Sequence, residues 1–173
     1  MSNYKEKLKQ ITTFVFDYDG VFSDGVVYVL ENGEMMRTTH SRDGYAVQLA
    51  IKKGYRIAVI TGANSPGVAE RFRHLDMPDI YLGASDKRSV FESFVEKYGL
   101  RKEEILVMGD DIPDYPMLQS AGVATCPADA VWEIRSVSEY VSIYPGGKGC
   151  VRDIIEQVMR LQGNWMQTDA YQW

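Results

Sequence analysis

The chain has 173 residues, of which 45% are hydrophobic, and this is enough apolar material for one domain with a substantial core. Lysine and arginine number 19 against 24 aspartate and glutamate residues, and no basic run is present, so we expect neither a nucleic-acid nor a membrane partner. Residues 1–10 are polar, and no apolar stretch approaches the roughly 20 residues that span a bilayer, so we expect a cytoplasmic protein with a single domain over residues 1–173. The two cysteines, Cys126 and Cys150, are not spaced as metal ligands and should be free, buried thiols.

Strand and helix signals alternate along the chain, which is typical of a parallel sheet covered by helices on both faces. Apolar runs rich in β-branched residues predict buried strands at residues 11–16, 56–60 and 105–108. Apolar periodicity and capping residues predict helices at residues 43–53, 65–75, 86–98 and 149–161. We therefore predict an α/β fold, a three-layer sandwich with a central parallel sheet.

One stretch after the first strand breaks this alternation. Residues 25–30 and 34–39 flank the turn signal Asn32-Gly33, which predicts a β-hairpin insertion over about residues 25–39. The hairpin is more apolar than a solvated flap needs to be, and we favour its burial against another subunit over packing on its own domain. The tail, residues 163–173, carries Trp165 and Trp173 and should be fixed either on its own domain or across an interface.

Small polar side chains follow three of the predicted strands at the point where each strand ends. Asp17 follows the first strand, Thr61 the second, and Asp110 the third, while Lys87 lies between the last two. The carboxyl ends of parallel strands meet at one edge of the sheet, where open α/β folds bind their ligands. We therefore expect these side chains to form one site.

The residue types indicate phosphoryl transfer. Beside Mg²⁺ and an ammonium group, the carboxylate of Asp17 can attack phosphorus and form an aspartyl phosphate. Asp19 returns to the same side of an extended chain and would act as general acid and base for the leaving alcohol and the water. The hydroxyl of Thr61 and the backbone N–H of Gly62 would hold a phosphate oxygen, and Lys87 would neutralise the transferred group.

Oxygen-only ligands suit Mg²⁺, so the acidic residues of the site predict magnesium as the cofactor. We assign Asp110 to the metal directly, and Asp111 and Asp114 to its outer shell. The full predicted metal set is Asp17, Asp19, Asp110, Asp111 and Asp114. Each of these segments has an ordinary explanation when taken alone, since aspartates at 110 and 111 could simply cap the helix near Pro113. Their order and shared position at strand ends favour the functional interpretation.

Asp17-Tyr-Asp-Gly20-Val, Thr61, Lys87 and Gly109-Asp-Asp-Ile-Pro-Asp114 resemble, in this order, the four motifs of the haloacid dehalogenase superfamily. The resemblance covers nearly the whole chain and implies a Rossmann-like fold. It also implies phosphatase activity, because the second aspartate of the first motif is the mark of the superfamily's phosphatases. The separations between the motifs leave room for a hairpin but for no cap domain.

Four longer segments are similar to the 3-deoxy-D-manno-octulosonate 8-phosphate phosphatases, a capless, tetrameric family of lipopolysaccharide precursor synthesis. They are Asp17-Tyr-Asp-Gly-Val-Phe-Ser-Asp-Gly25, Ser41-Arg-Asp-Gly-Tyr45, residues 83–87 and Pro145-Gly-Gly-Lys-Gly-Cys-Val-Arg-Asp153. The resemblance implies a homotetramer in which hairpins and tails of neighbouring subunits cover each site. It also implies a sugar-acid phosphate as substrate, bound by His40, Arg42, Asp43, Gly44, Gly62, Arg71 and Lys87.

Two alternatives stay open at this point. Many members of the family have arginine after the Thr-Gly of the second motif and nine-carbon relatives have glutamate, whereas this chain has Ala63, so 2-keto-3-deoxynononate or sialic acid 9-phosphate is a second candidate substrate. A phosphorylation-switched receiver domain also uses strand-end aspartates, a threonine, a lysine and Mg²⁺. However, a receiver has its acidic pair after the first strand and its phosphate-accepting aspartate near mid-chain, which is the opposite order.

Overall fold

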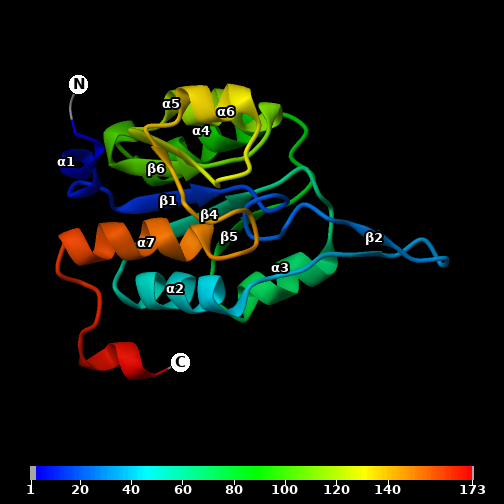
Figure 1. Cartoon of the computed structure of the whole chain (residues 1–173), viewed down its shortest axis with the longest axis horizontal. Coiled ribbons are helices and arrows are strands. Elements are labelled where there is room, and N and C mark those ends of the chain that lie inside the picture. The colour runs from blue at the N-terminus through cyan, green and yellow to red at the C-terminus, as the bar shows by residue number, and fades with distance from the viewer. Residues whose placement is uncertain (1–2, 173) are drawn as a thin grey trace.

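The computed structural model describes residues 3–172 and is built around one parallel sheet of six strands (Figure 1). The strand order is β5 (Asp79–Tyr81), β4 (Arg56–Ile60), β1 (Thr13–Phe16), β6 (Ile105–Met108), β7 (Val123–Cys126) and β8 (Tyr140–Val141). Phe16 at the end of β1 is paired with Val59 on one side and with Met108 on the other. The residues that follow these three strands therefore come out side by side at the same edge.

Helices cover both faces of the sheet (Figure 1). One face carries α1 (Tyr4–Leu8), α2 (Ser41–Lys52), α3 (Pro66–Arg73) and α7 (Cys150–Leu161), and the other carries α4 (Lys87–Tyr98), α5 (Tyr115–Ser120) and α6 (Trp132–Val137). Short 3₁₀ helices lie at η1 (Lys102–Glu104), η2 (Ile112–Asp114) and η3 (Thr168–Tyr171). The predicted three-layer α/β sandwich is confirmed.

The two apolar cores follow from the alternation of side chains along β1. Phe14 and Phe16 point into the core beneath α2 and α7, and Val15 points into the core beneath α4 and α5. All three side chains are fully buried. Cys126 and Cys150 are also buried and free, as predicted.

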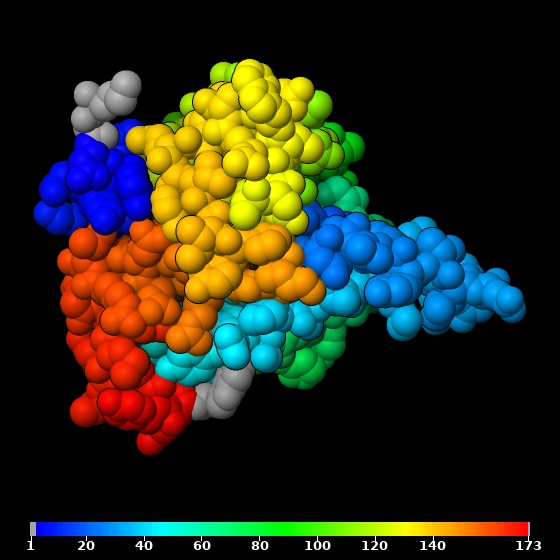
Figure 2. Space-filling model, in the orientation of Figure 1, coloured from blue at the N-terminus to red at the C-terminus, as the bar shows by residue number. Residues whose placement is uncertain are grey.

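The hairpin projects into open space from the edge of the sheet at which β1 ends (Figures 1 and 2). Its paired residues are fewer than predicted, since only β2 (Tyr28–Val29) and β3 (Met35–Met36) form a ladder. Val29 is 72% exposed, so the hairpin does not pack on its own domain. The apolar side chains of the hairpin are therefore left facing solvent in the single chain.

The tail packs against its own domain at the end of the molecule away from the hairpin (Figure 1). The side chain of Trp165 is buried, and the hydroxyl of Tyr45 donates a hydrogen bond to the carbonyl of Ala170. The ammonium of Lys53 lies 2.6 Å from the carboxylate of Asp169. Of the two alternatives for the tail, docking on α2 of the same chain is the one observed, and Trp173 lies outside the described residues. Within residues 3–172, no helix combines the length and the apolar character needed to cross a membrane.

Candidate active site

A cleft of ≈ 600 Å³ opens at the carboxyl ends of β1, β4 and β6. It is lined by the four residues predicted to be catalytic, Asp17, Asp19, Thr61 and Lys87, and by the three acidic residues of the fourth motif, Asp110, Asp111 and Asp114. The register of the sheet causes this gathering, because the loops after the three strands leave the edge at the same level. The predicted convergence of these motifs on one site is therefore observed.

Asp17 is held at the floor of the cleft. Its backbone N–H donates to the carbonyl of Met108 at 3.0 Å, and its side chain is nearly buried, with the residue 5% exposed. Burial raises the pKa of Asp17 to about 7; the charge of Asp114 adds to this rise and that of Lys87 opposes it. The carboxylate thus needs nearby positive charge in order to stay ionised.

Lys87 supplies part of that charge. Asp86 caps α4 by accepting the backbone N–H of Ser89 at 3.2 Å, which fixes Lys87 as the first helical residue. The Nζ atom of Lys87 lies 2.9 Å from Asp17 Oδ1 and 2.6 Å from Asp114 Oδ1. Burial by itself would lower the pKa of Lys87, but the two carboxylates raise it, so the lysine remains an ammonium.

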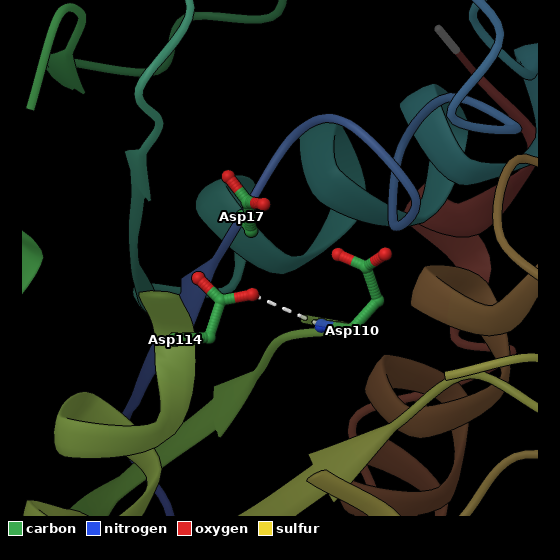
Figure 3. Close-up of side chains that lie close together, drawn as sticks. All are labelled: Asp17, Asp110 and Asp114. Carbon is green, nitrogen blue, oxygen red and sulfur yellow. Dashed lines mark hydrogen bonds between the residues drawn. The ribbon is translucent and has the colours of Figure 1, made fainter. Parts of the chain in front are cut away.

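Asp17, Asp110 and Asp114 form a cluster in which one oxygen from each lies within 4.8 Å of the others (Figure 3). Asp114 Oδ2 accepts the backbone N–H of Asp110 at 3.0 Å, and Asp110 Oδ1 is buried without a hydrogen-bond partner among the described residues. Burial raises the pKa of Asp110 to about 8, and the charges of Asp17 and Asp114 contribute to this rise. Three crowded carboxylates with an unpartnered buried oxygen fit a hard divalent cation.

Gly20 allows this crowding. Its φ is +80°, and a Cβ atom at this position would lie 2.0 Å from Asp110 Oδ2. Only glycine therefore lets the loop after β1 turn so close to the carboxylate of the fourth motif.

Two predicted metal residues stand outside the cluster. Asp111 is exposed and caps η2, with its Oδ1 accepting the N–H of Ile112 at 2.8 Å, so the capping role considered for this segment is real. The carboxylate of Asp19 is turned toward Arg37, whose Nε lies 2.9 Å and 3.1 Å from its two oxygens. Arg37 belongs to none of the four motifs, and the one signal for it in the sequence is a basic residue at the base of an insertion that begins next to the first motif.

Thr61 and the residues after it form another wall of the cleft. Thr61 is buried, and its Oγ1 accepts the N–H of Ala63 at 3.2 Å, which shapes the turn that leaves β4. Gly62 and Ala63 both line the cleft. The methyl group of Ala63 leaves this wall without a charge.

The residues predicted to bind substrate are not all brought together. Gly62 and Lys87 line the cleft, whereas His40 and Arg42 line a separate hollow of ≈ 440 Å³ with Arg152 and Lys148. The position of α2 explains this, because its N-terminus faces α7 and not the ends of β1 and β4.

The other three predicted contacts also lie outside the cleft. Asp43 is fully buried and accepts the backbone N–H of Arg152 at 2.8 Å. Gly44 packs beneath Arg71, with 2.3 Å between an added Cβ and the guanidinium, and Arg71 lines a groove under the hairpin. None of these side chains reaches the cleft of its own chain.

Comparison with known proteins agrees with this geometry. Residues 31–122 match the family described as haloacid dehalogenase-like hydrolase. The 3-deoxy-D-manno-octulosonate 8-phosphate phosphatase of Escherichia coli (strain K12) is 32% identical over 157 residues, which are 91% of this chain and 84% of the relative.

Solved structures give the same result. The 3-deoxy-D-manno-octulosonate 8-phosphate phosphatase of Moraxella catarrhalis, in complex with magnesium ion, phosphate ion and KDO, aligns with a TM-score of 0.92 at 30% identity, covering 99% of this chain and 97% of that chain. The enzyme of the same name from Yersinia pestis aligns with a TM-score of 0.92 at 28% identity, covering 94% and 88%. The magnesium in the first of these structures, with the carboxylate cluster described here, confirms the predicted cofactor. The chain belongs to the haloacid dehalogenase-like hydrolase family, and the relatives that match it over most of its length are phosphoric monoester hydrolases.

Proposed function

We propose that this protein is a Mg²⁺-dependent phosphatase that converts 3-deoxy-D-manno-octulosonate 8-phosphate to the free sugar acid and phosphate, in the cytoplasm, during lipopolysaccharide precursor synthesis. The observation that carries the proposal is the buried Asp17 carboxylate, 2.9 Å from Lys87 and clustered with Asp110 and Asp114 at the floor of an open cleft. The names of the relatives that match over most of the chain support the choice of substrate.

Asp17 is the nucleophile in this proposal. Its carboxylate attacks phosphorus in line and forms an aspartyl phosphate, while the ammonium of Lys87 offsets the charge that crowds the floor of the cleft. Asp17 and Asp110 would hold Mg²⁺, which would supply further positive charge to stabilise the phosphoryl group in transfer. Asp114 acts from the outer shell, because its two oxygens are already engaged by Lys87 and by the loop N–H of Asp110.

Asp19 is the general acid and base. It gives a proton to the leaving alcohol oxygen and then withdraws one from the water that hydrolyses the aspartyl phosphate. Thr61, with the N–H groups of its turn, holds a phosphate oxygen against the floor of the cleft. Each of these groups lines the same cleft as Asp17.

A nine-carbon sugar-acid phosphate is the second candidate substrate. Ala63 is the observation that keeps this candidate open. This position lies on the wall of the cleft and carries neither of the charged side chains that distinguish the two substrate groups in the family. The receiver alternative is set aside, because the chain belongs to a hydrolase family.

We also propose a homotetramer. The hairpin is apolar and exposed, and the cleft is open with no cap domain above it, so a neighbouring hairpin is the simplest cover. His40, Arg42 and Arg71 lie outside the cleft of their own chain and would contact substrate only in the cleft of a neighbour.

A phosphate-release screen tests the substrate. With Mg²⁺ present, we expect the eight-carbon sugar-acid phosphate to have the highest kcat/KM in a panel with nine-carbon sugar-acid phosphates and neutral hexose phosphates. A higher value for the nine-carbon compounds would establish the second candidate. Equal values across the panel would contradict both, because the enzyme would then not discriminate among sugar acids.

A further inference from the structure

Arg37 lies at the base of the hairpin, one residue after β3, and reaches from there into the cleft. Its side chain is only 12% exposed. The single N–H of Nε donates to the carboxylate of Asp19, and Nε lies 2.9 Å and 3.1 Å from its two oxygens. The base of the hairpin is therefore tied to the first motif by Arg37, as well as by the hydroxyl of Tyr18, which donates to the carbonyl of Thr38 at 3.0 Å, and Arg37 is the residue that lines the cleft.

Most of the guanidinium is unused. An arginine has five N–H donors, and four of them are on the two terminal nitrogens. Within residues 3–172 these two nitrogens make no hydrogen bond. Neither of them is a buried atom without a partner, as Nε of Arg71 is, so both remain accessible from the cleft. A largely desolvated guanidinium with open donors at its planar end is suited to a carboxylate or phosphate, which accepts two parallel hydrogen bonds.

The cleft contains little positive charge that is free to bind an anionic substrate. Five aspartates line it, and the basic residues among the described lining are Lys87 and Arg37. Lys87 is held between Asp17 and Asp114, at the end of the cleft where phosphorus is attacked. Ala63, which also lines the cleft, adds no charge to it. Among the described residues that line this cleft, Arg37 is thus the positively charged side chain that does not contact the nucleophile Asp17.

The position of Arg37 decides which anion it meets. Its contact with Asp19 puts it beside the acid that protonates the leaving oxygen, and therefore on the side of the cleft that holds the leaving alcohol. In the proposed function, on which this inference rests, that alcohol is a sugar acid with a carboxylate. We propose that the terminal nitrogens of Arg37 bind this carboxylate, so that Arg37 determines the selectivity for acidic sugar phosphates.

A cycle of two enzymes and two substrates tests the proposal. Wild type and Arg37→Gln are each given the sugar-acid phosphate and its carboxamide, which differ only in the charge and acceptor atoms at the carboxylate. Removal of a charge-assisted pair costs roughly 10–100-fold in kcat/KM, so we expect Arg37→Gln to lose that much more on the acid than on the amide, mainly through KM. Arg37→Lys should recover part of the loss, because it keeps the charge but not the planar fork.

The controls separate this role from its competitors. Arg101→Gln removes an exposed arginine that pairs with Glu104 near the opposite end of β6 and should leave the ratio of the two substrates unchanged. Equal loss on acid and amide would overturn the proposal, since it would mean that Arg37 acts on Asp19 or on the phosphoryl group common to both. No loss on either substrate would also overturn it.

The wild-type enzyme alone gives a second measurement that does not depend on a variant folding. It should prefer the acid over the amide by the same roughly 10–100-fold. A wild type that hydrolyses neither sugar compound contradicts the proposed function itself, whereas a wild type that prefers the acid while Arg37→Gln loses equally on both contradicts this inference alone.

Discussion

Lys87 Nζ lies 2.6 Å from Asp114 Oδ1, and this contact links the helix that begins at Lys87 to the loop that carries Asp110, the proposed metal ligand. Asp114 is fully buried, and its other oxygen accepts the backbone N–H groups of Asp110 at 3.0 Å and Asp111 at 3.4 Å. One side chain thus positions the lysine and shapes the loop at the same time.

We therefore expect Asp114→Asn to weaken magnesium binding without removing a ligand. Changes to groups that orient metal ligands typically cost about 10–100-fold in metal affinity or activity, and we expect the Mg²⁺ concentration for half-maximal activity to rise within that range. Asp111→Asn is the matched control, because Asp111 is exposed and outside the cluster, and its effect should be smaller. Equal shifts for the two variants would show that the contact between Lys87 and Asp114 does not organise the loop.

Asp17→Asn should abolish turnover and preserve the fold. The two side chains are nearly the same size, but the amide is not a nucleophile, and loss of such a group costs about 10⁴-fold or more in kcat. Phosphate release and circular dichroism measure the two effects on protein checked by mass spectrometry for deamidation. Activity within tenfold of wild type would rule out Asp17 as the nucleophile.

The metal-free protein should lose stability as the pH rises. In the folded state the pKa of Asp17 is about 7 and that of Asp110 about 8, both above the value for an exposed aspartate near 4. The folded state therefore holds these protons more tightly than the unfolded state, and the stability that they contribute is present below about pH 4 and is lost as the pH rises to about 8.

Thermal melts in EDTA and in Mg²⁺ at pH 5.5 and pH 8 measure this effect. We expect a lower Tm at pH 8 in EDTA and a larger Mg²⁺-induced rise in Tm at pH 8, because the cation binds the ionised form. In Asp17→Asn/Asp110→Asn, both differences should shrink. A Mg²⁺ effect that is the same at the two pH values would contradict the link between these carboxylates and the metal.

The sequence predicts the part of this protein that is fixed by strand register. Asp17, Thr61 and Asp110 each follow a buried strand, and parallel pairing of these strands places all three residues at the same edge of the sheet. Strands β5, β7 and β8 are not predicted from the sequence, because segments of two to four residues carry too little periodicity to be recognised in the pattern alone.

Contacts that depend on the direction of a loop or helix could not be predicted in the same way. Arg37 reaches Asp19 because the hairpin folds back at its base, and His40 faces α7 because of the way in which α2 packs. Neither direction is encoded in a local pattern. The tail is a further example, since Trp165 has no period around it and its place beside α2 is decided by packing and by the ion pair of Lys53 with Asp169.

The last prediction concerns the hairpin, whose cross-strand partners Val29 and Met35 are both largely exposed in the single chain. A charge at an exposed position changes stability by less than about 0.5 kcal/mol, whereas a charge buried without a partner in an interface costs far more. Val29→Asp should therefore leave a folded chain but dissociate the oligomer, as measured by light scattering. Activity toward the sugar-acid phosphate should fall before activity toward p-nitrophenyl phosphate, because the small aryl phosphate depends less on cover from a neighbour.

Glu31→Gln, near the tip of the same hairpin, is the control for this prediction. It removes a charge without adding one to the apolar surface, and the oligomer should keep its wild-type mass. If wild type is itself a monomer with full selectivity for the sugar acid, the cover must come from the chain's own residues and the hairpin has another role.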